Sequence, residues 1–180
     1  MRRIAILVVA IGVTIAFGAF VFIRRGVGAR NAPSSFETTV ARTLRHFAIP
    51  PSLRNERNPV QLTPQTLAEA RAHWADHCAL CHANDGSGNT EIGRNLYPRA
   101  PDMRLPETQK LSDGELFAIV RDGIRLSGMP GWGGTDADNW KLVHFVRHLP
   151  KLTAEEVRDM ERLNPKSPEE IEEDQFLHGH

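Results

Sequence analysis

Residues 78–82 of this 180-residue chain are Cys78-Ala79-Leu80-Cys81-His82, and this run contains both of the chain's cysteines. With two cysteines, a disulfide-rich scaffold is excluded. Upstream, Thr63 suits a helix N-cap and Pro64 the first helical position. The positions that then recur at helical spacing are Leu67, Ala70, Trp74 and Cys78. A helix is therefore expected from about Pro64 to Ala79, with the cysteine run at its end.

A C-x-x-C-H run is the attachment signature of c-type haem. Two thiols on one helical turn can add to the two vinyl groups of the porphyrin, and the adjacent His82 then lies beneath the iron as an axial ligand. Two alternatives remain. A thioredoxin-type dithiol needs a strand–helix context, and no strand pattern is visible. A zinc site could recruit His73, His77 and His82 with both thiols, although structural zinc sites usually draw ligand pairs from separate elements. Covalent haem is the preferred interpretation.

Two further helices are predicted by their caps. Ser112 and Glu115 form a capping box that opens a helix ending at Asp122. Thr135 with Asp138 caps a last helix, which Pro150 closes. Prolines at 98, 101 and 106 favour an irregular, loop-like stretch over residues 90–110.

The predicted domain is all-helical with long loops. Three helices and two irregular stretches bury too little apolar surface by themselves. We therefore expect something other than side chains to fill the middle of the domain.

The N-terminus has the pattern of a membrane anchor. Ile4 to Ile23 is uncharged, and as a helix it spans roughly 30 Å, about the thickness of a bilayer's hydrocarbon core. Arginines flank both ends, so the charge rule leaves the orientation open. The competing interpretation is a cleaved signal peptide. Against it, the apolar run is long, and Arg24-Arg25 stands where a small-x-small cleavage site is expected. Residues 1–25 are predicted to be a transmembrane anchor.

The chain's net charge of zero hides an asymmetry. Residues 24–63 carry seven arginines against two acids, whereas residues 151–180 carry four basic and nine acidic side chains. A neutral total argues against a nucleic-acid partner, which needs clustered basic residues.

Residues 26–63 are predicted to be an extended, partly helical stem. A short helix from Ser35 to Phe47 carries an apolar stripe of Val40, Leu44 and Phe47, which we expect to dock on the following domain. Contact of the stripe with a partner is the alternative. Residues 151–180 form an acidic extension with a helix from about Thr153 to Leu163. Its end, with His178 and His180, is either a metal-binding or docking tail or a solvated terminus.

Residues 64–150 resemble a class I c-type cytochrome domain, on the strength of the cysteine run, the helix pattern and a later methionine loop. In that family a Met before the last helix is the second axial ligand. Met129, within Ser127-Gly128-Met129-Pro130-Gly131-Trp132, matches this position. Met103 and Met160 are the other downstream candidates. The resemblance implies a cytochrome c-like fold wrapped around one covalent haem c, between an N-terminal transmembrane helix and a helical acidic extension.

The resemblance also implies a packing arrangement and a haem pocket. The first and last helices should cross through Ala70, Trp74, Trp140 and Phe145. The carbonyl of Pro98 or Pro101 should accept a hydrogen bond from the axial His82. The side chains that could hydrogen-bond the haem propionates are Arg94, Arg99 and Trp132.

His/Met ligation leaves no open iron position, so the implied function is one-electron transfer rather than catalysis. The alternatives are the haem-bearing subunit of a larger membrane oxidoreductase, or a haem sensor or peroxidase-like protein with a displaceable Met129. The implied partners are a membrane-associated redox donor and acceptor; the oligomeric state is open. Because this family acquires haem outside the bacterial cytoplasm, the resemblance implies a single-pass inner-membrane protein with its haem domain in the periplasm.

Overall fold

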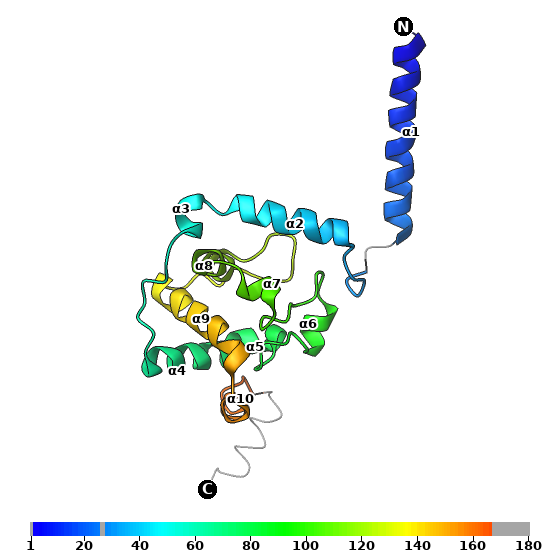
Figure 1. Ribbon diagram of the computed structural model, residues 1–180. Coiled ribbons are helices and arrows are strands. Elements are labelled where there is room, and N and C mark those ends of the chain that lie inside the picture. The colour runs from blue at the N-terminus through cyan, green and yellow to red at the C-terminus, as the bar shows by residue number, and fades with distance from the viewer. Residues whose placement is uncertain (1, 26–27, 167–180) are drawn as a thin grey trace.

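The computed structural model describes residues 2–25 and 28–166. In these residues the regular secondary structure consists of helices joined by loops, with no strand (Figure 1). An all-helical fold is therefore confirmed. The elements, in chain order, are α1 (Arg2–Arg25), α2 (Ser35–Ala48), α3 (Pro51–Arg54), α4 (Pro64–His73), the π-helical turn η1 (Trp74–Cys78), α5 (Ala79–His82), α6 (Glu91–Asn95), α7 (Pro106–Gln109), α8 (Asp113–Asp122), α9 (Asp136–His148), the 3-10 turn η2 (Leu149–Lys151) and α10 (Ala154–Glu161).

Helix α1 stands apart from the globular part of the molecule (Figure 1). Among the described residues it is the one helix long and apolar enough to cross a membrane, and none of its apolar segment is buried against residues 28–166. An apolar helix with no polar face and no protein covering is expected to sit in lipid, or to be a signal sequence.

The hydrophobic core lies where α9 packs against α4 and α8. The indole of Trp74 contacts Phe145 with ring centroids 5.4 Å apart. On the other side of α9, Phe117 stacks on Trp140 at 4.2 Å. Both aromatic pairs are buried. The predicted crossing of the first and last domain helices through Trp74 and Phe145 is confirmed.

The predicted caps are present. The Thr63 side chain accepts a hydrogen bond from the backbone N–H of Thr66, and Ser112 with Glu115 forms a reciprocal capping box. The prediction of an irregular stretch over residues 90–110 is wrong in part, because α6 and α7 are short helices within it. Thr90 caps α6, and Pro106 occupies the first position of α7.

The stem packs on the domain at its C-terminal end and not through the apolar stripe of α2. Its end packs on the domain, since Ser112 Oγ donates to the Arg54 carbonyl at 2.7 Å and Asn58 Nδ2 to the Trp140 carbonyl at 2.8 Å. The apolar stripe of α2, by contrast, is exposed along its length, so the expectation that it docks on the domain is wrong. Helix α2 is held instead by polar contacts from its other residues.

The acidic extension begins with α10, opened by a capping box between Thr153 and Glu156. Met160 in this helix is fully buried and belongs to the domain core. The helix predicted over residues 153–163 is thus present and packed. The predicted roles of His178 and His180 concern positions outside the described residues.

Candidate haem site

The cysteine run lies at the end of a continuous helical segment formed by α4, η1 and α5. The π-helical turn η1 ends at Cys78, so the helix is locally widened just before the motif; such turns are frequent at functional sites. Cys78 is buried and Cys81 half-buried, and both are free thiols. The two sulfurs lie one helical turn apart, as attachment to one porphyrin requires.

His82 is buried, with 9% of its surface exposed, and its ring lies against the indole of Trp74 at 5.7 Å between centroids. Burial lowers the pKa of His82 to about 4. The imidazole is therefore neutral at physiological pH, which is the form that binds a metal. Its Nδ1 is buried and has no hydrogen-bond partner in the part of the chain that the structure describes.

The backbone after the motif folds back around His82. Ala83 has φ 62° and ψ 160°, a conformation that glycine adopts and other residues rarely do. This turn points the Ala83 carbonyl at Trp74, whose Nε1 donates to it at 3.0 Å. The N–H of Gly88 then donates to the His82 carbonyl at 2.8 Å. The role of Ala83 was not predicted from sequence, because alanine gives no signal for a positive φ.

Helix α6 packs on the second cysteine. Thr90 Oγ1 donates to the Cys81 carbonyl at 3.2 Å. Gly93 approaches the same carbonyl so closely that a Cβ there would lie 2.2 Å from the oxygen. Only glycine fits at this contact. The segment predicted as a loop is therefore a short helix fitted against the motif.

The loop that carries Met129 is attached to segments on both sides of the motif. Gly128 packs against Leu96, whose Cδ2 would be 2.5 Å from a Cβ at that glycine. Trp132 contacts His77, the residue before Cys78, with perpendicular rings at 5.3 Å. Met129 lies between these two anchors and is half-buried. The loop is therefore tied to the segment that holds the two cysteines.

The other methionines are engaged elsewhere. Met160 is fully buried in the core, and Met103 packs against the core with its N–H donating to the Gly86 carbonyl at 2.8 Å. The sequence position of Met160 indicated an acidic tail, but the residue belongs to the packed interior.

The two prolines predicted to face His82 are both exposed, and neither carbonyl bonds its Nδ1. Pro101 is connected to His82 through Gly88: a Cβ at this glycine would lie 3.0 Å from the Pro101 oxygen. The Gly88 N–H in turn bonds the His82 carbonyl. The bond Tyr97–Pro98 is cis.

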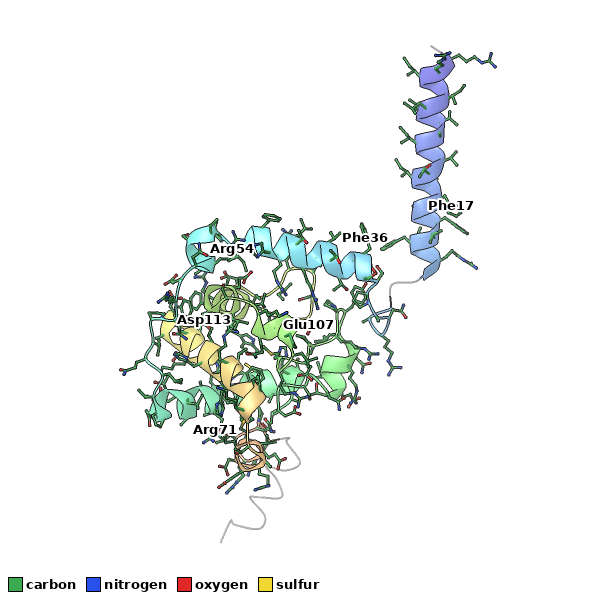
Figure 2. The ribbon with its side chains drawn as sticks, in the orientation of Figure 1. Phe17, Phe36, Arg54, Arg71, Glu107 and Asp113 are labelled. Atoms are coloured by element: carbon green, nitrogen blue, oxygen red, sulfur yellow. The ribbon has the colours of Figure 1, made fainter. Side chains whose placement is uncertain are left out.

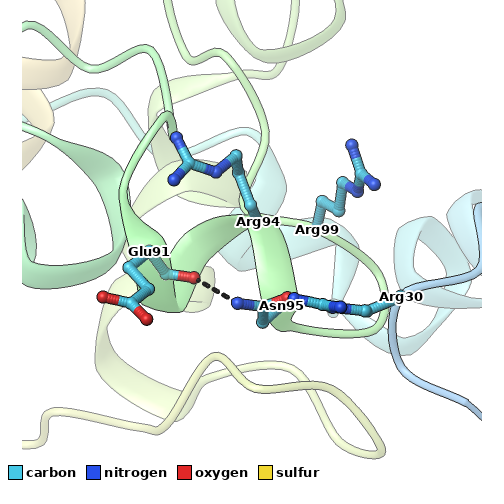
Figure 3. A pocket seen from close by; sticks show the side chains of 5 residues that line it. All are labelled: Arg30, Glu91, Arg94, Asn95 and Arg99. Carbon is cyan, nitrogen blue, oxygen red and sulfur yellow. Dashed lines mark hydrogen bonds between the residues drawn. The ribbon is translucent and has the colours of Figure 1, made fainter.

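Three arginines gather in one pocket beside α6 (Figure 3). Arg94 and Arg99, both predicted to serve the haem, line it together with Arg30 from the stem. Arg30 Nε donates to Asn95 Oδ1 at 2.9 Å, and Asn95 Nδ2 donates to the Glu91 carbonyl at 2.9 Å. The pocket has a volume of about 460 Å³ and an excess of positive charge, which suits carboxylates. Trp132 does not line this pocket. Arg30 was not predicted, since nothing local links residue 30 to residue 95.

The donor set fits covalent haem better than the alternatives. Burial raises the pKa of Cys78 to about 12 and that of Cys81 above its ordinary value, so both are protonated at neutral pH. A redox dithiol relies on a thiolate, which this environment disfavours. Among the described residues, no three histidine, cysteine or acidic side chains converge to hold a metal ion. A ligating histidine normally donates its second ring nitrogen to a hydrogen-bond acceptor, and Nδ1 of His82 has none among the described residues.

Comparison with known families agrees with this chemistry. Residues 65–146 match the model of the family described as cytochrome c oxidase, cbb3-type, subunit III. A comparison with curated proteins finds no match. The family match covers α4 to α9, the cysteine run and the Met129 loop. Residues 65–146 are therefore a class I c-type cytochrome domain with covalently bound haem c as its cofactor.

Proposed function

We propose that this chain is a membrane-anchored, mono-haem electron carrier whose iron is ligated by His82 and Met129. The observation that carries the proposal is the attachment of the Met129 loop on both sides to the segments around the cysteine run, through Gly128–Leu96 and Trp132–His77.

His82 supplies a neutral imidazole through Nε2, because burial keeps its pKa low. Its Nδ1–H has no acceptor among the described residues and would need one to fix the ring plane. Of the two predicted proline carbonyls, that of Pro101 has the closer support, through its contact with Gly88. Cys78 and Cys81 hold the macrocycle by thioethers.

Arg94 and Arg99 receive the haem propionates, supported by the positive charge of their shared pocket. Bidentate guanidinium–carboxylate pairs would orient the macrocycle as well as neutralise it. Trp132, whose ring is perpendicular to that of His77, closes the site on the side of the methionine loop.

Bound haem supplies a one-electron couple whose potential is raised by Met/His ligation. The chain's own part would be to hold the iron with His82 and Met129 and to keep water from it. With no open position, electron transfer to partner proteins is the activity that remains, and weak redox encounters need only small interfaces.

Helix α1 anchors the domain to a bilayer, as its length and apolar surface support. Since c-type haem is acquired outside the bacterial cytoplasm, residues 28–166 lie in the periplasm. The protein is then a single-pass protein of the inner membrane.

A second candidate function is a dedicated subunit of a larger membrane oxidoreductase. The matching family is described as an oxidase subunit, which favours it. Copurification from solubilised membranes separates the two candidates: a subunit stays in a stoichiometric complex in mild detergent, whereas a free carrier elutes alone.

Carbon monoxide tests the ligation. Reduced wild-type protein should bind it slowly and incompletely, because Met129 would already be bound to the iron. Met129→Leu should bind it rapidly and completely, whereas the control Met103→Leu should behave as wild type. Rapid, complete binding by the wild type would instead support a sensor or peroxidase-like protein, and unchanged binding by Met129→Leu would exclude Met129 as a ligand.

A further inference from the structure

Helix α2 exposes a continuous apolar face. Four large side chains recur at positions i, i+4, i+8 and i+11, which lie on one side of a helix. They are Phe36, Val40, Leu44 and Phe47, with 75%, 39%, 64% and 74% of their surfaces exposed. No residue of α2 is buried. A face of this kind on a soluble surface requires a covering partner.

The helix is nevertheless fixed to the cytochrome domain. His46 Nδ1 bonds Glu115 Oε1 at 2.8 Å, near one end of α2. At the other end, Tyr97 Oη donates to Glu37 Oε1 at 3.1 Å. Ile49, directly after the helix, is buried. Because polar contacts hold α2 at both ends, its apolar face is presented outward.

The position of α2 relative to α1 indicates what covers this face. Helix α1 ends at Arg25 and α2 begins at Ser35, and Arg30 between them is bonded to Asn95 of the domain. The chain therefore has little length with which to leave the membrane surface. In Figure 1, α2 lies across the direction of α1, level with its C-terminal end. Figure 2 shows Phe36 at the end of α2 that follows the connection.

Charge points to the same surface. Arg24, Arg30 and Arg42 are exposed along α1, the connection and α2. Arginines on the polar side of a helix that also carries an apolar face are the pattern of a helix lying in the interface of a bilayer with anionic headgroups. One face of a single helix is also small for a stable protein interface.

We propose that α2 is an interfacial membrane helix, whose apolar face inserts at the headgroup boundary of the bilayer that α1 spans. This inference rests on the proposed anchoring through α1. Two attachments, one spanning and one lying flat, hold the cytochrome domain against the membrane in a fixed orientation instead of leaving it on a flexible tether.

Site-directed spin labelling of the full-length holoprotein tests this. Cys78 and Cys81 are consumed by haem attachment, so a third cysteine can be labelled alone. The label is placed on the apolar face by Leu44→Cys, on an exposed α2 position off that face by Ala41→Cys, and in the span by Phe17→Cys. Each protein is reconstituted at high dilution in vesicles containing phosphatidylglycerol, and the label's accessibility to a water-soluble nickel chelate is measured against that to oxygen.

We expect the label at 44 to be several-fold less accessible to nickel than the label at 41, and the label at 17 to be the most protected. Equal accessibility at 44 and 41, with protection at 17, would overturn the interfacial helix and leave the anchor intact. Loss of protection at 17 would instead refute the proposed anchoring. Protection at 44 that disappears as the protein is diluted in lipid would identify a second copy of the chain, and not lipid, as the occupant. An unchanged haem spectrum in each variant shows that the domain remains folded.

Discussion

Ala83→Gly should stabilise the cytochrome domain. Ala83 follows the axial His82 directly and has φ 62° and ψ 160°, in a region of backbone space that is essentially restricted to glycine. The surrounding contacts impose this conformation, because the Ala83 carbonyl accepts from Trp74 Nε1 and the His82 carbonyl accepts from Gly88. None of these bonds uses the alanine side chain, so all survive the substitution.

The magnitude follows from two opposing effects. Strained backbone of this kind costs on the order of 1–3 kcal/mol, which glycine relieves. Glycine also gives the unfolded chain more freedom, which costs about 0.4–1 kcal/mol. The net expectation is a gain of roughly 0.5–2 kcal/mol in the free energy of unfolding.

Guanidinium unfolding of the detergent-solubilised holoprotein, followed by haem absorption, measures this change. Ala68→Gly is the matched control, because Ala68 is exposed in the interior of α4 with helical backbone. At this helical position the change from alanine to glycine should lower the free energy of unfolding by roughly 0.5–1 kcal/mol. If both variants are destabilised alike, the backbone strain assigned to Ala83 is absent and the reasoning fails.

Two further outcomes are expected. Arg147→Lys should lower the free energy of unfolding by about 1–3 kcal/mol. The Arg147 guanidinium donates to the Gln109 and Leu111 carbonyls at once, and a lysine ammonium lacks the planar, forked donor geometry to do so. An unchanged urea midpoint would contradict this. The hydrogen bond from Arg104 lowers the pKa of Asp102, so this pair stabilises the fold above the ordinary carboxyl pKa and ceases to do so as pH falls through the depressed value. Arg104→Gln should therefore cost at most about 1 kcal/mol at neutral pH, and the difference from wild type should vanish in acid; a difference that grows in acid would reverse the assigned sign.

The helices that local chemistry defines could be predicted from sequence. Thr63 before Pro64, and Ser112 with Glu115, satisfy backbone N–H groups within one turn, so their effect does not depend on distant residues. Helix α6 has a cap of the same kind at Thr90 but only five residues. A helix so short is stabilised by its packing on Cys81, which no local pattern reveals.

The apolar stripe of α2 shows a different limit. Its periodicity correctly predicted a helix with one apolar face, but periodicity does not say what covers that face. The domain was the expected neighbour, and the structure leaves the face exposed. Contacts between segments remote in sequence decided the outcome, in particular His46 with Glu115 and Tyr97 with Glu37.

In the site, covalent haem attachment could be predicted from sequence because its signature lies in five consecutive residues. The environment of His82 was not, since its burial against Trp74 and the orphaned Nδ1 arise from tertiary packing. Likewise, the pocket of Arg94 and Arg99 includes Arg30 only because the stem folds back onto α6.

The most direct test of the account is pyridine haemochrome analysis of the matured protein, paired with a reduced-minus-oxidised spectrum and the intact mass. We predict a c-type haemochrome, one haem per chain, and a mass that retains the haem after denaturation, because Cys78 and Cys81 hold it by thioethers. Protein that is colourless after maturation, or that releases its haem on denaturation, would contradict the central claim.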